Sequence, residues 1–239
     1  MEINFQPFPA LENTDSDGLL AMGGDLSVDT LVSAYAQGIF PWFNEGQPIL
    51  WWSPDPRLVL FPSQLRIGKS LRKSVRNRYH VTCNVAFEEV ILHCALRGDT
   101  EKKDTGTWIT EDMNNAYIDL HRCGYAHSVE VWKDQELVGG LYGIALGSVF
   151  FGESMFSHKS DASKVGLVYL CQHLINLDFK IIDCQVSSSH LLSLGAINID
   201  RNKFMSYLFG MQIDQPHIDF SKKFPAEPNS LHQLLNEMI

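Results

Sequence analysis

The segment from residue 148 to residue 185 constrains the fold of this 239-residue chain most strongly. Two short apolar runs, 148–153 and 180–185, have the composition of buried strands, and the stretch 161–177 between them is typical of a helix. We read these elements as a βαβ crossover, in which the two strands run parallel and the connection is right-handed. We therefore expect a mixed α/β fold that contains a βαβ unit.

Further elements precede this unit. Ser27 is suited to cap a helix that ends at Gly38, because apolar residues recur between them at helical spacing. The segments 128–133 and 136–144 have the pattern of strands joined by a tight turn. The first 62 residues are rich in Gly, Pro and Trp, so we expect a junction between two domains at about 54–63.

The composition excludes several classes of protein. Hydrophobic residues make up 45% of the chain and charged residues 20%, which excludes a disordered chain. No run of about 18 apolar residues is present, and the first residues lack the features of a secretory signal. The five cysteines are odd in number and show no C-x-x-C spacing, which favours reduced thiols in a cytoplasmic protein.

One group of basic residues contrasts with an acidic chain. The net charge is −9, yet six of the 19 basic residues lie between Arg66 and Arg78 with no acidic residue among them. In a helix over about 66–77, apolar residues would recur on one side and four cations would face roughly the opposite way. We name these four the basic stripe: Lys69, Arg72, Lys73 and Arg76. The helix should pack by its apolar side and expose the basic stripe.

Three polar residues fall where the two parallel strands are expected to end. Glu153 belongs to the first strand, and Asp183 and Gln185 belong to the second. Ligands of α/β sheets usually bind beside the carboxyl ends of parallel strands, and residues two apart share one face of a strand. With apolar neighbours, these residues predict a site for a small ligand. The alternative interpretation is that Glu153 and Asp183 only cap the turns that follow.

Other site motifs are weak or absent. The chain has no Ser nucleophile elbow and no P-loop, and the glycines of 137–147 lack a dinucleotide-binding fingerprint. His121, Cys123 and His127 do not have the spacing of a zinc site, so we expect no metal. Three tryptophans within 42–52 lie among prolines, where they suit either stacking on unpaired nucleotides or plain packing.

Ten motifs follow one another along the chain. They are GLLAMGGDLS (18–27), YAQGIFPWF (35–43), PILWWSPDPR (48–57), TWIT (107–110), HSVEVW (127–132), LVGGLYG (137–143), FFGESMFS (150–157), DASK (161–164), DCQ (183–185) and HLLSLGA (190–196). Together they closely resemble the leucyl/phenylalanyl-tRNA–protein transferases, from about Phe8 to about Phe209. The tail after Met211 is not covered by the resemblance.

The resemblance implies an aminoacyltransferase that moves Leu or Phe from aminoacyl-tRNA to the N-terminal Arg or Lys of a protein and so creates a bacterial N-degron. It also implies a small N-terminal α/β domain, taken as residues 1–60, followed by a GNAT-like acyltransferase domain over residues 61–239. The implied partners are Leu-tRNA and Phe-tRNA as donors and proteins as acceptors. We expect no cofactor, no metal, no membrane partner and a monomer in the cytoplasm.

The resemblance also assigns roles to residues. It places Glu153, Asp183 and Gln185 at the catalytic end and the basic stripe at the tRNA acceptor stem. It implies that Trp42 and Trp108 contact the aminoacyl-adenosine. Four apolar residues near the strand ends are our candidates for the side-chain pocket: Leu141, Phe150, Met155 and Ile182. An apolar pocket separates side chains that differ by one methylene by only about 1–3 kcal/mol, so we expect some use of Met.

The implied reaction is aminolysis of an ester. An α-amino group has an ordinary pKa of about 7.7–8.0, so much of it is neutral at physiological pH, and orientation alone can remove about 7–11 kcal/mol of the barrier. Our hypothesis is that Asp183 orients or deprotonates the incoming amine through Gln185. Glu153 would hold the amino group of either the donor or the acceptor. The alternative route is substrate-assisted, through the terminal ribose hydroxyl.

Two other functions compete with this interpretation. A GNAT acyl-CoA N-acyltransferase would hold a pyrophosphate on a glycine-rich turn before a helix, but the corresponding stretch HKSDASKVG (158–166) lacks that turn. A non-catalytic tRNA-binding or degron-adaptor module would keep the basic stripe and the tryptophans. It would not need three polar residues at the mouth of one pocket.

Overall fold

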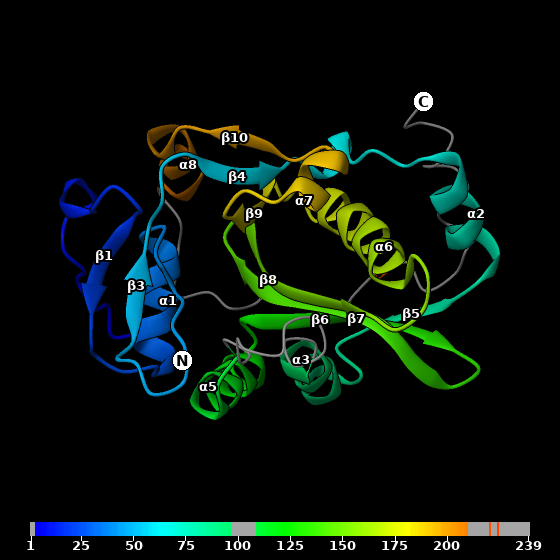
Figure 1. Cartoon of the computed structure of the whole chain (residues 1–239), viewed down its shortest axis with the longest axis horizontal. Coiled ribbons are helices and arrows are strands. Elements are labelled where there is room, and N and C mark those ends of the chain that lie inside the picture. The colour runs from blue at the N-terminus through cyan, green and yellow to red at the C-terminus, as the bar shows by residue number, and fades with distance from the viewer. Residues whose placement is uncertain (1–2, 97–108, 210–219, 221–223, 225–239) are drawn as a thin grey trace.

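The N-terminal part of the chain forms a small sheet with one helix, at the left of Figure 1. A computed structural model describes residues 3–96, 109–209, 220 and 224. The small sheet has the order β1–β3–β2, and both pairs are antiparallel. The elements of this N-terminal part are a 3-10 helix (Leu11–Asn13), β1 (Leu19–Met22), α1 (Val28–Ala36), β2 (Phe40–Pro41) and β3 (Leu50–Trp52). The side chain of Ser27 accepts a hydrogen bond from the Thr30 amide, which confirms the expected N-cap of α1.

A seven-stranded sheet forms the centre of the molecule, in the order β10–β4–β9–β8–β7–β6–β5. All neighbouring strands are antiparallel except β8 and β9, which are parallel. The strands are β4 (Arg57–Leu60), β5 (His80–Cys83), β6 (Ala126–Lys133), β7 (Glu136–Leu146), β8 (Val149–Ser157), β9 (Ile181–Gln185) and β10 (Ile197–Ile199). The sheet confirms the mixed α/β class.

Helices cover both faces of this sheet (Figure 1). On one face lies α6 (Ala162–Asn176), the crossover helix of the expected βαβ unit, and on the other lie α3 (Phe87–Leu96) and α5 (Glu111–Arg122). The remaining helices are a 3-10 helix (Pro62–Gln64), α2 (Lys69–Asn77), α7 (Ser189–Ser193) and α8 (Arg201–Leu208). The buried side chains accordingly form two clusters, one on each face of the sheet.

Strand β8 is longer than the sequence indicates. It pairs with β9 only from Val149 to Phe151, which is opposite Asp183, and its later residues continue to pair with β7 up to Ser157. The expected end of this strand at Glu153 is therefore wrong. Glu153 instead lies on β8 just beyond the last β8–β9 pair, where the two parallel strands have separated.

Two other expectations concern the start of α2 and the boundary between the two domains. Helix α2 begins at Lys69, not at residue 66, because Gly68 is its N-cap. The division after residue 60 stays a prediction, but β4 pairs with β9, so residues 57–60 belong to the seven-stranded sheet. That pairing favours a boundary a few residues earlier in the chain.

Two glycines that face each other across β7 and β8 allow a matched test of the packing. A Cβ on Gly143 would lie 2.1 Å from the Phe151 carbonyl oxygen and 2.6 Å from the Phe150 ring. A Cβ on Gly152 would meet only ordinary contacts, the nearest at 3.5 Å. We expect Gly143→Ala to lower the free energy of unfolding by about 1–3 kcal/mol, because it overpacks the sheet. Gly152→Ala should change it by less than about 1 kcal/mol.

Urea denaturation of both variants and of the unchanged protein measures this difference. Equal stability of the two variants would contradict the close approach of the Phe150 ring to β7.

Candidate active site

A cavity of about 1120 Å³ opens where β8 and β9 separate. Residues of β2, β4, α3, β7, β8, α6, β9 and α7 line it, so its walls combine the small N-terminal sheet with the central sheet and its helices. Glu153 and Gln185 lie at its polar end, as the sequence predicts for residues next to the carboxyl ends of parallel strands.

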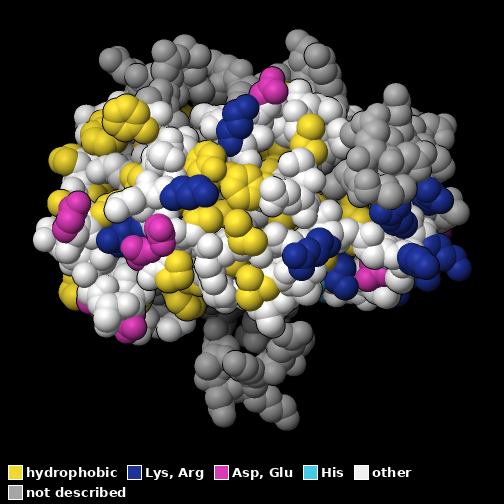
Figure 2. Space-filling view, turned by 90° about the horizontal axis from the view of Figure 1, so that it is seen from above, with side chains coloured by type: hydrophobic (Ala, Val, Ile, Leu, Met, Phe, Trp, Pro, Cys, Tyr) yellow, Lys and Arg dark blue, Asp and Glu magenta, His cyan; other side chains and the backbone are white. Residues whose placement is uncertain are grey.

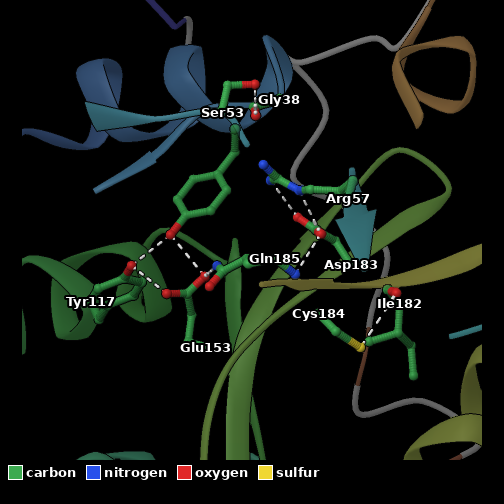
Figure 3. A network of polar contacts seen from close by, with 10 residues as sticks. Gly38, Ser53, Arg57, Tyr117, Glu153, Ile182, Asp183, Cys184 and Gln185 are labelled. Atoms are coloured by element: carbon green, nitrogen blue, oxygen red, sulfur yellow. Dashed lines mark hydrogen bonds and ion pairs between the residues drawn. The ribbon is translucent and has the colours of Figure 1, made fainter. Parts of the chain in front are cut away.

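Glu153 is held by hydrogen bonds from three elements (Figure 3). Tyr35 of α1 donates to its Oε1 at 2.9 Å, and Tyr117 of α5 donates to its Oε2 at 2.7 Å. The amide Nε2 of Gln185 also donates to Oε1, at 2.9 Å. The two tyrosine hydroxyls lie 2.6 Å apart. These contacts fix the carboxyl group of Glu153 and connect it to the N-terminal sheet unit through α1.

Burial raises the pKa of Glu153 to about 7, because removing the carboxylate from water disfavours its charged form. The hydrogen bonds from Tyr117, Tyr35 and Gln185 lower the pKa, and the negative charge of Asp183 raises it. Burial also raises the pKa of both tyrosines, which therefore keep their hydroxyl protons and remain donors. Glu153 thus changes charge close to neutral pH.

Asp183 is fully buried and does not line the cavity. Its carboxylate forms a bidentate ion pair with Arg57 of β4, with Nε at 2.8 Å and Nη2 at 2.7 Å. It also accepts a hydrogen bond from the backbone N–H of Gln185 at 2.9 Å (Figure 3). Gln185 has a φ of +63°, in the left-handed region, so this bond stabilises a backbone conformation that non-glycine residues rarely adopt. Asp183 therefore acts on the position of Gln185, and of these two residues Gln185 is the one that lines the cavity.

Cys184 also lines the cavity, and its thiol donates to the Ile182 carbonyl. Burial and the neighbouring Asp183 raise its pKa well above the ordinary value, because both disfavour a thiolate. A protonated thiol is a poor nucleophile, so the arrangement does not favour covalent catalysis through this cysteine.

The structure brings together the four apolar residues expected in the side-chain pocket. Leu141, Phe150, Met155 and Ile182 all line the cavity, on the side of the sheet that α6 covers. The sequence did not indicate several further apolar residues of the cavity lining, among them Leu60, Leu167 and Leu170. An apolar lobe beside a few placed polar groups is typical of a small-ligand site.

The described residues predicted to contact the aminoacyl-adenosine and the tRNA lie in different parts of the structure. Trp42 lines the cavity with 44% of its surface exposed, and its ring lies 5.9 Å from that of Trp52. Trp108 lies outside the described residues. In α2, Lys69, Lys73 and Arg76 are exposed and Arg72 is partly buried, whereas Leu71 and Val75 are buried. Figure 2 shows Lys and Arg side chains gathered at the end of the molecule where α2 lies.

The sequence did not identify the residues that hold the polar groups. Tyr35, Tyr117 and Arg57 are each more than 30 residues from their partners in the chain. The available signal was a tyrosine on the otherwise apolar inward side of each of the two helices, because a buried hydroxyl needs a partner.

Within the described part of the chain, no group of three or more His, Cys, Asp and Glu side chains is arranged to hold a metal ion. Likewise, no helix among the described residues is long and apolar enough to cross a membrane.

Comparisons with known proteins place this geometry in a family. The family model for the leucyl/phenylalanyl-tRNA protein transferase matches residues 59–209, and the model for the N-terminal domain of that transferase matches residues 24–55. A transferase of this name from Pseudomonas fluorescens is 56% identical over 220 residues, covering 91% of this chain and 96% of the relative.

A second relative of the same name, from Nitrosomonas eutropha, is 53% identical over 224 residues, covering 90% of this chain and 94% of the relative. Among solved structures, a GCN5-related N-acetyltransferase from Kribbella flavida matches at 13% identity with a TM-score of 0.36, over 69% of this chain and 58% of that chain. The family models and the relatives decide the assignment: the chain belongs to the leucyl/phenylalanyl-tRNA protein transferase family.

Proposed function

We propose that this protein transfers Leu or Phe, and less efficiently Met, from aminoacyl-tRNA to the N-terminal Arg or Lys of acceptor proteins. The observation that carries the proposal is the pairing of Glu153 and Gln185 with an apolar lobe in one cavity. An aminoacyl group has an apolar side chain and a charged amino group, and the cavity offers a complement to each. The acceptor preference and the creation of an N-degron rest on the family resemblance.

Glu153 is placed to bind the amino group of the donor. The acceptor amine must be neutral when it attacks, whereas the donor amine can stay charged throughout the reaction. A carboxylate in a partly buried site stabilises a bound ammonium group more strongly than an exposed carboxylate does. We therefore assign Glu153 to the donor, with the donor side chain lying in the apolar lobe against Phe150 and Met155.

Gln185 is placed to orient the acceptor amine. Its amide nitrogen donates to Glu153, which leaves its carbonyl oxygen to accept a hydrogen bond from an amine. The attack forms a C–N bond and breaks the ester C–O bond, and the amine proton is transferred to the ribose oxygen that leaves. Asp183 contributes by holding the backbone of Gln185, so it is a positioning residue in this scheme.

The N-terminus of α6 disfavours an acyl-CoA donor. Asp161 is the residue before this helix, and its carboxylate interacts with the Lys164 ammonium at 3.4 Å and the Ser74 hydroxyl at 3.1 Å. The Ser163 amide already donates to the Ser157 hydroxyl at 3.2 Å. A helix N-terminus that binds pyrophosphate offers free amides and no carboxylate. Because aminoacyl-tRNA is the proposed donor, we propose that the protein acts in the cytoplasm. That the protein is a monomer stays a prediction.

The first test supplies Leu-tRNA with labelled leucine, and peptides that begin with Arg or Ala. We expect transfer of label to the Arg peptide, much less to the Ala peptide, and none from labelled acetyl-CoA. Gln185→Ala should lower the single-turnover rate about a hundredfold, because the amine loses its orientation. Label from acetyl-CoA, or no transfer from either donor, would contradict the proposed function.

The second test measures kcat/KM against pH. Since the pKa of Glu153 is raised to about 7, the carboxyl group becomes neutral as the pH falls through that value. The donor ammonium then loses its partner, so kcat/KM should decline below about pH 7. In Glu153→Gln this decline should be absent, and only the ordinary titration of the acceptor amine at about pH 7.7–8.0 should remain.

A donor that carries a hydroxyl group in place of the α-amino group provides the control for this assignment. Such a donor has no charge for Glu153 to bind, so its pH profile should be the same with Glu153 and with Gln at this position. If the decline near pH 7 persisted with the hydroxy donor, Glu153 would bind the acceptor amine instead.

The third test concerns the basic stripe. We expect the affinity for tRNA to fall steeply with salt, because phosphate contacts release counterions. Lys73→Ala should weaken binding and reduce the slope of log K against log salt by about one, without changing kcat at saturating tRNA. Lys203→Ala, on the exposed surface of α8, is the matched control and should leave the slope unchanged. A slope that is equal in both variants would exclude the basic stripe from tRNA binding.

A further inference from the structure

Phe220 lies in the tail that follows the family match, yet it is among the most buried residues of the protein, with 2% of its surface exposed. Its ring stacks on His127 of β6 at 4.2 Å and on Phe150 of β8 at 5.8 Å, and it meets the edge of His173 of α6 at 4.8 Å. The ring of Phe220 thus packs between the seven-stranded sheet and α6.

The backbone of Phe220 is anchored as well as its ring. Its carbonyl oxygen accepts a hydrogen bond from Nε2 of His173 at 2.5 Å and a weaker one from Sγ of Cys83. Burial lowers the pKa of His173, so this imidazole is neutral and donates the bond from Nε2. Contacts from β5 and α6 therefore hold Phe220 from two sides.

Phe150 contacts this anchored ring and also lines the cavity, whereas Phe220 is not among the lining residues. Its own ring approaches β7 so closely that a Cβ on Gly143 would be 2.6 Å from it. Offset aromatic pairs at this separation are attractive. The ring of Phe150 is thus confined by β7 and by Phe220, while it also lines the apolar lobe of the cavity.

We propose that Phe220 is a specificity-determining residue of the transfer reaction: it backs Phe150 and thereby sets the depth of the side-chain pocket. The inference rests on the proposed function, because it concerns the pocket that receives the donor side chain. With Phe220 in place, Phe150 cannot retreat and the lobe accepts side chains of the size of Leu, Met and Phe. Without it, Phe150 moves into the vacated space and the lobe admits a larger ring.

The experiment compares Trp-tRNA with Leu-tRNA as donors to the same Arg peptide. In Phe220→Ala we expect the ratio of kcat/KM for Trp to that for Leu to rise about tenfold, the lower limit of what one methylene contributes in an apolar pocket. Phe220→Leu keeps part of the backing volume and should give a smaller rise in the same direction. It also tests the inference if Phe220→Ala does not fold.

Phe224→Ala is the matched control. Phe224 belongs to the same tail and contacts the same helix, with its ring 5.0 Å from His173 and 6.3 Å from Tyr169, but its described ring contacts do not include Phe150. This variant should lose stability without a change in the Trp-to-Leu ratio. Thermal unfolding and both donors are measured for every variant.

The outcomes separate the inference from the proposed function. If the unchanged protein transfers Leu and folded Phe220 variants keep its Trp-to-Leu ratio, Phe220 is only structural and the inference is wrong. It is equally wrong if Phe224→Ala shifts the ratio as much as Phe220→Ala. If the unchanged protein transfers no amino acid from either tRNA, the proposed function itself fails.

Discussion

The buried ion pair between Arg57 and Asp183 is the interaction on which the site depends. Moving two charges out of water is costly, and a bidentate geometry offsets only part of that cost. Two aromatic rings stabilise the Arg57 guanidinium further, because its central carbon lies 4.7 Å from the ring centres of both Phe40 and Phe204. These rings come from β2 of the small sheet and from α8, so the pair forms fully only when both pack against the central sheet. Loss of either partner would leave an uncompensated buried charge.

The consequences of this pair extend to the cavity through short contacts. Asp183 fixes the backbone of Gln185, and the Gln185 amide fixes Glu153, whose other oxygen is held by Tyr117. The charge of Asp183 also contributes to the raised pKa of Glu153. One buried carboxylate thus positions a second carboxyl group and raises its pKa without reaching the cavity. In the proposed reaction Asp183 would therefore act only through the residues beside it.

The sequence indicated the βαβ unit and the polar residues beside it, because strand pattern and helix length are local properties. It placed Glu153, Gln185 and the four pocket residues near one another for the same reason. It did not reveal the partners of these residues, since Arg57 is 126 residues from Asp183 and Tyr35 is 118 residues from Glu153. Nor did it show that β8 continues past Glu153, because that extension is set by pairing with β7. Phe220 was missed because no pattern in the tail shows where it packs.

The placement of the basic stripe relative to the cavity follows from contacts between α2 and the start of α6. The Ser74 hydroxyl of α2 donates to Asp161 at 3.1 Å, and the Tyr79 hydroxyl donates to the Ser160 carbonyl at 2.7 Å. Ser160 and Asp161 both line the cavity. If the basic stripe binds a phosphate backbone as proposed, these contacts set its distance from the cavity. Since the net charge of the chain is −9, the basic stripe is the part of the chain to which a phosphate backbone would be attracted under this proposal.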